Sequence, residues 1–400
     1  MTGSTEQAVK AARSLLSARA VRERAHEMLA AALAGEVAEW SVDLAKLEAA
    51  ADLTAAVVRD AYPDLKVPFH ARWRHFVVAG RDLWAEREKP WSDSRAQARA
   101  AFDLAITSVL LDAGAGATWR YADEATGAVL GRSEGLGIAS FRMFESGAMS
   151  ADPTDPLRAD GLAKIDAAVL ARAFQVTDAN PLVGLEGRAA LLRTLGAAVG
   201  RPGALFDVMA AGAVDGKLKA PIILEVILEA LGPIWPSRLS LGGVPLGDCW
   251  RHPAIRRDDP TDGLVPIHKL SQWLSYSLIE PLETAGIEVV DIDGLTGLAE
   301  YRNGGLFVDT GVLALSDPAQ AARPQPVEGP LVVGWRSLTV ALLDRIAPLV
   351  RDRLDVRAED FPLARVLEGG TWAAGRRIAR QLRPADGGPP LTVISDGTVF

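Results

Sequence analysis

Residues 266–285 read PIHKLSQWLSYSLIEPLETA and carry the clearest helical pattern of the chain. Ile267, Leu270, Leu274 and Leu278 recur every three or four positions, so they share one side of an α-helix. A stretch of this length and period predicts a long helix that buries an apolar stripe.

The other side of this predicted helix carries His268, Lys269, Gln272 and Tyr276. A solvated face would carry mostly Glu, Lys and Arg, whereas a ring nitrogen, an amide and a phenol are typical of a pocket wall that orients a polar ligand. A polar interface between two lobes is the structural alternative.

Similar patterns extend outward in both directions from this segment. They predict helices over residues 6–34, 43–62, 93–113, 133–146, 161–174, 181–199, 204–211, 221–231, 331–354 and 371–382. Residues 119–131 predict a short hairpin, and residues 391–400 a short strand pair. The expected fold class is therefore mainly α with minor β.

Residues 151–160 contain two prolines and three aspartates, which favours a loop between two lobes. We therefore expect an N-terminal helical lobe over residues 1–155 and a C-terminal lobe over residues 156–400, with one continuous fold as the alternative. Length is consistent with this, because 400 residues exceed a typical single domain.

Composition excludes several classes of protein. Lys and Arg number 43 against 51 Asp and Glu, giving a formal charge of -8 with no basic cluster, so a nucleic-acid partner is not expected. Cys249 is the single cysteine, which rules out an intramolecular disulfide. Charged residues interrupt every long apolar stretch and the N-terminal segment, so we expect no membrane span or signal peptide and a cytoplasmic location.

Two loop-like segments carry carboxylates of interest. Asp248 and Trp250 lie in residues 247–253, where Asp248 is either a functional carboxylate or a turn former. In residues 291–305 we expect Asp293 to begin a short helix, Gly297 to leave room beside Glu300, and residues 303–305 to end the helix. A recessed Glu300 is a candidate general base, and a buried ion pair is the alternative.

Residues 68–76, PFHARWRHF, combine two arginines, two histidines and a tryptophan, which suits either anion binding or an amphipathic surface segment. His70 and His75 are five residues apart and have no acidic neighbour, so we expect no metal site. The chain also lacks a glycine-rich phosphate loop, and no cofactor is expected.

Several blocks together resemble the uracil-catabolism protein family long described as a domain of unknown function. They are residues 68–76, 109–116, 132–136, 247–250, 280–282, 295–305, 368–376 and 395–400. The match runs from about residue 68 to the end of the chain. The resemblance implies a route in which uracil is attached to ribose and its ring is opened, so that a later step must release urea from the sugar.

A second resemblance covers only the C-terminal part. HKLSQ at residues 268–272 followed by LTGLAEYR at residues 295–302 is similar to queuosine 5′-phosphate N-glycosidases, helical proteins related in fold to DNA glycosylases. That family has Asp where Glu300 stands, and Pro-Gln where residues 303–305 read Asn-Gly-Gly. The resemblance implies a two-lobed helical architecture and an N-glycoside hydrolase.

N-glycoside hydrolysis needs a carboxylate near the anomeric carbon, a proton for the leaving nitrogen and a water. We expect Glu300 to stabilise the developing cation and activate water, and Asp248 to be the second carboxylate. The expected contacts to a ribosyl substrate, including a 5′-phosphate where one is present, come from the following side chains: Trp119, Trp250, His268, Lys269, Gln272, Tyr276, Tyr301 and Arg302.

Two other functions fit the same residues. One is a non-catalytic protein that binds a pathway intermediate, and the other is a hydrolase that opens the uracil ring. Both are alternatives to the N-glycoside hydrolase. Product identity separates the two enzymes, since ring opening leaves the sugar attached. The sequence leaves open the oligomeric state, with a homo-oligomer allowed, and the phosphorylation of the substrate.

Overall fold

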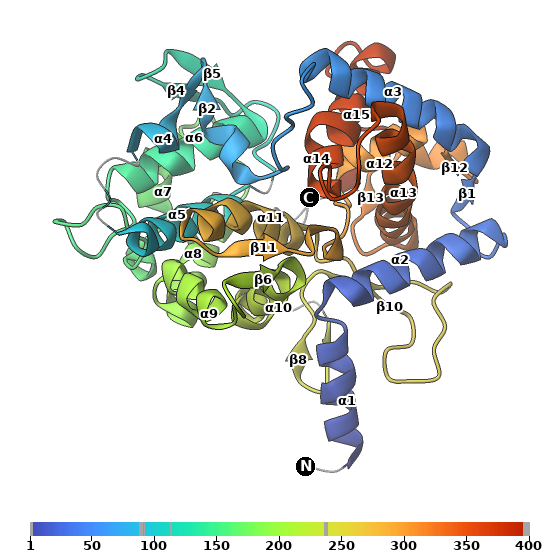
Figure 1. Cartoon of the computed structure of the whole chain (residues 1–400), viewed down its shortest axis with the longest axis horizontal. Coiled ribbons are helices and arrows are strands. Elements are labelled where there is room, and N and C mark those ends of the chain that lie inside the picture. Colours follow the sequence, from blue (N-terminus) through green and yellow to red (C-terminus); the bar gives the residue numbers. More distant parts are fainter. Residues whose placement is uncertain (1–2, 88–90, 92, 113, 236–238, 395–400) are drawn as a thin grey trace. The chain divides into compact units, whose positions relative to one another are not determined.

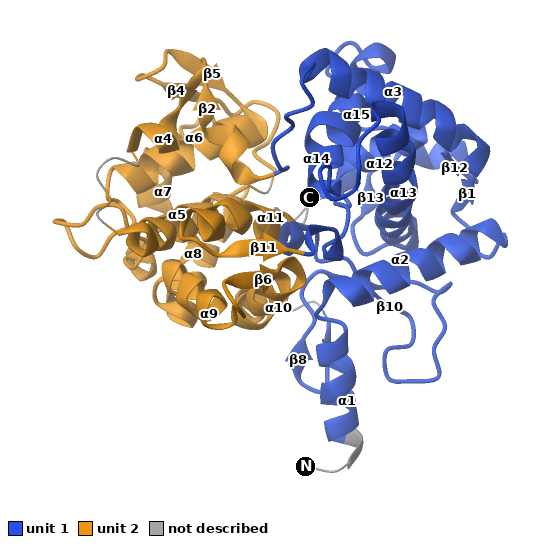
Figure 2. Ribbon diagram, viewed as in Figure 1, with its two compact units in different colours: residues 1–70, 237–272, 291–395 blue, residues 71–236, 273–290, 396–400 orange. Residues whose placement is uncertain are grey.

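The computed structural model describes residues 3–87, 91, 93–112, 114–235 and 239–394 (Figure 1). The chain divides into two compact units, each assembled from separate segments (Figure 2). Unit 1 takes its described residues from the ranges 1–70, 237–272 and 291–395, and unit 2 from 71–236 and 273–290. The expected boundary near residue 155 does not coincide with this division. Residues 151–160 lie within unit 2, where Ser150 Oγ bonds the carbonyls of Asp152 and Asp155.

Unit 1 is built around a long buried helix. Its α-helices are α1 Gly3–Ser14, α2 Ala18–Leu33, α3 Leu47–Ala61, α12 Tyr301–Asp309, α13 Pro330–Leu354, α14 Leu363–Arg365 and α15 Trp372–Leu382. Helix α13 packs against α2 and α3, and α12 packs against α15 and α13. Most side chains of α13 between Leu331 and Ala347 are buried, which explains why its sequence is apolar around most of its circumference.

Unit 2 is a second helical assembly. Its α-helices are α4 Leu83–Arg87, α5 Ser94–Leu110, α6 Arg132–Glu145, α7 Ala167–Ala173, α8 Leu185–Val199, α9 Leu205–Ala211 and α10 Ala220–Leu231. Helix α11, Lys269–Thr284, begins in unit 1 and continues in unit 2. Helix α5 is buried on nearly all sides and packs against α6, α8 and α9.

Strands contribute only short two-stranded pairs in the described residues. Antiparallel pairs are β1 Trp40–Val42 with β12 Leu313–Leu315, β2 Val77–Val78 with β3 Arg81–Asp82, β4 Tyr121–Asp123 with β5 Ala128–Leu130, β7 Ser240–Leu241 with β8 Val244–Pro245, and β9 Cys249–Arg251 with β10 Leu264–Pro266. Parallel pairs are β6 Lys217–Lys219 with β11 Glu288–Val290, and β13 Gln325–Pro326 with β14 Val393–Ile394. The expected fold class, mainly α with minor β, is confirmed, as is the hairpin predicted over residues 119–131. Of the predicted strand pair at residues 391–400, only β14 lies in the described part, and its partner is β13.

Short 3-10 helices join the longer elements. They are η1 Leu44–Lys46, η2 Arg72–Phe76, η3 Leu162–Lys164, η4 Pro202–Ala204, η5 Gly232–Ile234, η6 Ile292–Gly294 and η7 Pro318–Ala322, while η8 Val366–Thr371 is a π-helix. The helix predicted over residues 6–34 is divided in two, because Ser17 adopts an extended conformation and accepts a hydrogen bond from Ala20 N as the N-cap of α2.

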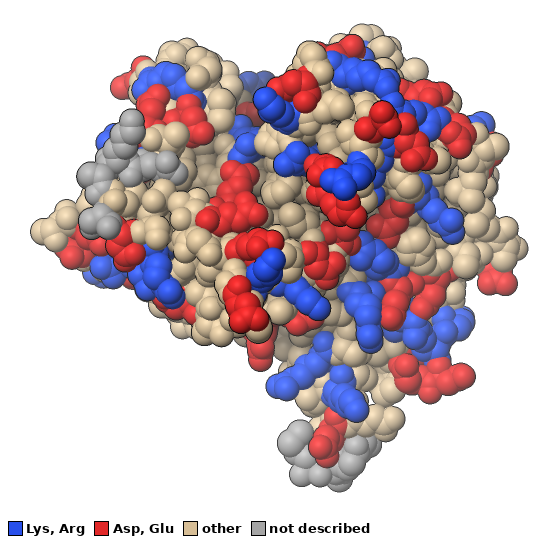
Figure 3. All heavy atoms as spheres, viewed as in Figure 1, with Lys and Arg blue, Asp and Glu red and all other residues tan. Residues whose placement is uncertain are grey.

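Charged side chains are mixed on the surface. On the face drawn in Figure 3, Lys and Arg lie among Asp and Glu and are not gathered into one basic area. No helix in the described ranges is both long enough and apolar enough to cross a membrane.

Candidate functional site

Glu300 is the N-cap of helix α12 in unit 1. Its backbone is extended, with φ -103° and ψ 158°, and its carbonyl accepts a hydrogen bond from Gly304 N at 2.9 Å. The expectation that residues 303–305 end a helix begun at Asp293 is wrong: these residues lie inside α12. The reason is packing, because a Cβ on Gly304 would lie 2.7 Å from Trp335 Nε1, so only glycine lets α12 approach α13 this closely.

The space expected beside Glu300 at Gly297 is also absent. A Cβ built on Gly297 would lie 2.6 Å from Leu343 of α13, so that neighbouring side chain already fills the position. The glycine therefore permits close packing and does not open a recess. Asp293 does not cap α12 either; its carboxylate accepts hydrogen bonds from Leu363 N and Arg351.

The Glu300 side chain lies in a buried polar group that we call the His70 cluster: His70, Glu300, Asn303, Glu368 and Thr371. His70 Nε2 is 3.3 Å from Glu300 Oε1, and His70 Nδ1 is 2.5 Å from Glu368 Oε2. Side-chain exposure is 6% for His70, 14% for Glu300 and 17% for Glu368. One imidazole thus joins two carboxylates that are 68 residues apart in the chain.

The electrostatics of this arrangement make His70 a cation at neutral pH. Burial, the largest single effect, lowers the pKa of His70, but hydrogen bonds and charge interactions with Glu300 and Glu368 together outweigh it and raise the pKa to about 10. Both ring nitrogens of the imidazolium then donate, one to each carboxylate.

A second chain of hydrogen bonds ends at the same Glu300 oxygen that His70 contacts. Asn303 Nδ2 donates to Glu300 Oε1 at 3.1 Å and to Leu298 O at 3.1 Å, and Thr371 Oγ1 donates to Asn303 Oδ1 at 2.8 Å. Asn303 and Thr371 are both fully buried. The carboxylate is therefore held by neighbours whose own rotamers are fixed, as a preorganised site requires.

Glu368 comes from an unusual piece of backbone. It lies in the π-helix η8, Val366–Thr371, between α14 and α15. Such single π turns are rare and are frequent at functional sites. Aromatic rings lie close by: the ring centroids of His70 and Trp372 are 6.1 Å apart, and the guanidinium of Arg376 lies 5.4 Å from the Trp372 ring centroid.

Tyr301 and Arg302 occupy the first turn of α12, directly after Glu300. Tyr301 is half-buried, and the Arg302 guanidinium lies 4.8 Å from the centroid of its ring. Arg302 itself is 6% exposed and donates from Nη1 to Gly387 O at 2.7 Å.

Asp248 belongs to a different cluster of unit 1. Its two oxygens each accept a hydrogen bond from Arg336 at 2.8 Å, Oδ1 accepts from Trp250 Nε1 at 2.6 Å, and Oδ2 accepts from Lys269 N at 2.9 Å. Burial alone would raise the pKa of Asp248, but the Arg336 charge and these hydrogen bonds hold that pKa well below its usual range. Asp248 therefore stays ionised and joins β9 to the start of α11 and to α13.

His268 and Gln272 are buried beside this cluster. His268 adopts φ 49°, a left-handed conformation, and its Nε2 is 3.0 Å from Leu15 O. Burial lowers the pKa of His268, which is therefore neutral at pH 7. Gln272 Nε2 donates to Thr296 Oγ1 at 2.7 Å, and Thr296 N donates back to Gln272 Oε1 at 3.3 Å. This reciprocal pair fixes the loop that leads to Glu300.

The two remaining predicted site residues lie in unit 2. Trp119 is fully buried and donates from Nε1 to Phe174 O at 3.0 Å, and Tyr276 of α11 is also fully buried. The structure thus brings Glu300, Tyr301 and Arg302 together at the start of α12. Asp248, Trp250, His268, Lys269 and Gln272 lie near the start of α11.

Sequence reasoning did not place His70, Glu368, Asn303 or Thr371 among the site residues. The available signal was indirect. Residues 68–76, 295–305 and 368–376 are among the blocks that resemble the uracil-catabolism family, and each block supplies members of the His70 cluster. Nothing in their spacing showed that the blocks meet. In the described part of the chain, no group of three or more His, Cys, Asp or Glu side chains is placed to hold a metal ion.

Comparison with known proteins supports the family predicted from these blocks. The model of the family described as "Protein of unknown function (DUF1688)" matches residues 14–400. The chain is 39% identical to Protein urg3 of Schizosaccharomyces pombe over 410 residues, covering 99% of this chain and 100% of that protein. It is 38% identical to Uracil catabolism protein 4 of Lachancea kluyveri, covering 92% of this chain and 93% of that protein. The chain therefore belongs to the DUF1688 family, whose relatives include a uracil catabolism protein.

Proposed function

We propose that this protein is an N-glycoside hydrolase of uracil catabolism that splits a ribosylurea-type or pyrimidine ribonucleoside substrate into urea or base and a ribose. The full-length similarity to Uracil catabolism protein 4 supports the pathway. The observation that carries the reaction class is the His70 cluster, in which one buried imidazolium lies between Glu300 and Glu368.

The charge of this cluster suits the reaction. Glycoside cleavage passes through an oxocarbenium-like state, so positive charge develops on the sugar. With both carboxylates ionised, Glu300, Glu368 and the His70 cation together carry one net negative charge. A fixed negative group in a site with little water stabilises a developing cation without reorganisation during the reaction.

Each member has a distinct role in this proposal. Glu300 faces the anomeric carbon and stabilises the developing cation. It accepts a proton from the attacking water, whose oxygen bonds to that carbon as the C–N bond breaks, and passes this proton to the leaving nitrogen. His70 is a positioning residue, since its two nitrogens hold both carboxylates. We assign Glu368 as the second carboxylate of the reaction in place of Asp248, which the sequence suggested. The Asp248 oxygens already accept hydrogen bonds from Arg336, Trp250 and Lys269.

We assign the substrate contacts to the residues next to Glu300 in the chain. Tyr301 and Arg302 adjoin Glu300 at the start of α12, where helix amide groups favour an anion. We assign them to the sugar and to a 5′-phosphate where one is present. Asp248 shapes the turn at His268 and Lys269, and so positions the Gln272–Thr296 pair that precedes Glu300.

The test is turnover of synthetic ribosylurea by the full-length protein, with urea and ribose quantified by chromatography. Glu300→Gln keeps the shape of the side chain and removes its charge, so we expect turnover to fall on the order of 10²-fold or more. Glu328→Gln is the matched control, because Glu328 is exposed in unit 1, and it should turn over at the wild-type rate.

The other outcomes are informative. Turnover that survives Glu300→Gln contradicts the role of Glu300. Thermal stabilisation by ribosylurea without any product indicates a binding protein. Consumption of a uracil riboside with the sugar still attached to the product indicates a ring-opening hydrolase.

A further inference from the structure

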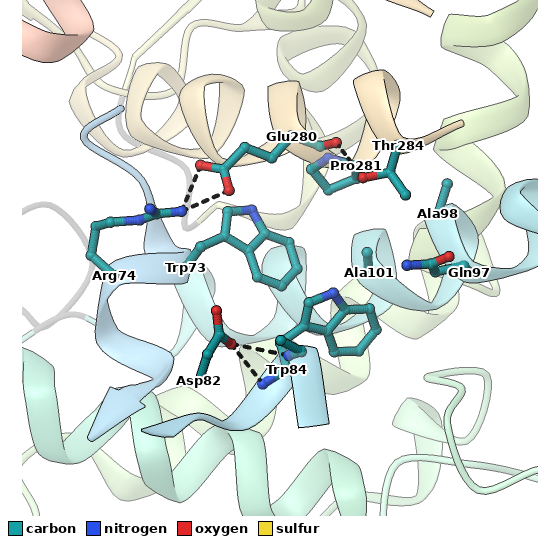
Figure 4. A pocket seen from close by; sticks show the side chains of 11 residues that line it. Trp73, Arg74, Asp82, Trp84, Gln97, Ala98, Ala101, Glu280, Pro281 and Thr284 are labelled. Carbon is teal, nitrogen blue, oxygen red and sulfur yellow. Dashed lines mark hydrogen bonds and ion pairs between the residues drawn. The ribbon is translucent and has the colours of Figure 1, made fainter. Parts of the chain in front are cut away.

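Unit 2 contains a cavity that the proposed reaction does not use. Its volume is about 120 Å³, roughly ten times the 10–15 Å³ that a single water molecule needs. Figure 4 shows side chains that line it. They are Trp73 of η2, Asp82 of β3, Trp84 of α4, Gln97 and Ala101 of α5, and Glu280, Pro281 and Thr284 of α11. All of these residues belong to unit 2.

Two tryptophan rings form one wall. Trp73 and Trp84 have ring centroids 5.5 Å apart and an interplanar angle of 46°. Trp73 is anchored, because its Nε1 donates to Ser277 O at 2.7 Å. Adjacent indole faces of this kind provide a stacking surface for a planar ring.

The cavity also has unused hydrogen-bonding groups. Neither Trp84 Nε1 nor the Gln97 amide has a hydrogen-bond partner among the residues that the structure describes. Trp84 Nε1 is a donor, and the Gln97 amide both donates and accepts. A ligand that satisfies them needs carbonyl oxygens and at least one N–H group.

Charge restricts the ligand further. Arg74 Nη2 donates to both oxygens of Glu280, at 2.7 and 2.6 Å, so these two charges offset each other. Asp82 has no ion-pair partner in the described residues; its Oδ1 accepts from the amides of Trp84 and Ala85. The lining therefore has an excess of negative charge, which disfavours an anionic ligand such as a nucleotide.

We propose that this cavity binds a small, neutral, planar ring that carries carbonyl and N–H groups, the chemistry of a cyclic amide or ureide. The ring stacks on Trp73, one carbonyl oxygen accepts from Trp84 Nε1 in the plane of that indole, and Gln97 pairs with the amide edge of the ring. The site is independent of Glu300, since every residue that lines it lies in unit 2.

The experiment is calorimetric titration of the full-length protein with uracil as the probe. We expect saturable binding of one molecule per chain. Dihydrouracil has the same carbonyl and N–H groups on a puckered ring and should bind about tenfold more weakly, because it stacks less well. Uridine 5′-monophosphate, which is anionic, should not compete for the site.

Variants locate the site. Trp84→Phe keeps a ring beside Trp73 and removes the indole donor, and Gln97→Leu removes the amide; each should weaken uracil binding roughly three- to tenfold. Gln7→Leu, the same change on an exposed position of α1, is the matched control and should bind as the wild type does. Circular dichroism confirms that each variant is folded.

Three results overturn this inference: no saturable binding of uracil at millimolar concentration, binding that Trp84→Phe and Gln97→Leu both leave unchanged, or binding that disappears in Glu300→Gln. The last result would place uracil at the His70 cluster. Trp84→Phe and Gln97→Leu test the uracil site, whereas Glu300→Gln tests turnover. Uracil binding that depends on Trp84 and Gln97 supports this inference whether or not Glu300→Gln abolishes turnover, so either proposal can fail without the other.

Discussion

His70 Nδ1 lies 2.5 Å from Glu368 Oε2, a short contact between a buried imidazole and a carboxylate on a π-helix. His70 N also donates to Ala364 O, so backbone and side chain of this residue both bind the segment that leads into α15. Glu300 completes the arrangement at the other ring nitrogen. The contact has consequences for protonation, for stability and for turnover.

The first prediction concerns the protonation of His70. Its pKa is raised to about 10, whereas burial lowers those of His252 and His268. At pH 8 one histidine should therefore be doubly protonated while these two remain neutral. Nitrogen-15 chemical shifts of the imidazoles, assigned with His70→Gln, measure this directly, and a neutral His70 at pH 8 would contradict the proposed cation.

The second prediction is the pH dependence of stability. A folded pKa of about 10 exceeds the ordinary histidine value of 6.5, so the folded state binds the proton more tightly. The stabilisation is fully present below pH 6.5 and is lost as the pH rises towards 10. The free energy of unfolding in urea should fall across this window in the wild type and fall less steeply in His70→Gln. Parallel slopes for the two proteins would rule out the linkage.

The third prediction tests the Asp248–Arg336 pair. Arg336 is 1% and Asp248 12% exposed at the side chain, so Asp248→Asn leaves a buried guanidinium without its counter-charge. Breaking a buried pair in this way costs roughly 3–5 kcal/mol. Chemical denaturation measures the loss. Asp258→Asn, at an exposed position, is the control and should change stability by less than about 0.5 kcal/mol.

The fourth prediction concerns the glycine contact between α12 and α15. A Cβ on Gly375 would lie 2.1 Å from the carbonyl oxygen of Arg302, and neither backbone can yield without moving the helix that Glu300 caps. Gly375→Ala should cost roughly 1–3 kcal/mol and should also lower turnover. Gly187→Ala in α8 meets nothing within 4 Å and should be neutral or stabilising by up to about 1 kcal/mol. Equal thermal melting of the two variants would show that the close approach does not matter.

The fifth prediction is that Cys249 is unreactive. The thiol is fully buried, and burial, with the nearby Asp248 charge as a smaller effect, raises its pKa far above the usual range. Because the thiolate is the reactive form, a thiol reagent should not modify native protein at pH 8 and should modify one group per chain in denaturant. Rapid labelling of the native protein would show that β9 opens.

Local patterns in the sequence predicted most of the helices. Apolar residues at intervals of three and four gave α5, α6, α10, α13 and α15 to within a few residues, and the expected hairpin formed as β4 and β5. Such signals are reliable because a helix stripe or a turn depends on residues a few positions apart. The family likewise followed from contiguous blocks.

The predictions failed where distant segments determine the backbone. Residues 303–305 look like a helix end, since glycine is common there, yet they lie within α12, where Gly304 packs against Trp335 and Thr339 of α13. The division into two units also depends on distant segments, because each unit combines segments from separate parts of the chain.

The sequence by itself determined the helical class, the approximate extent of the long helices, the family, and Glu300 as a residue of interest. Tertiary structure alone decided that His70 has Glu300 and Glu368 as neighbours and that the charge of Asp248 is offset by Arg336. The physical reason is that the charge state of a buried group depends on its spatial neighbours and on its exclusion from water, and here those neighbours lie 230, 298 and 88 residues away along the chain.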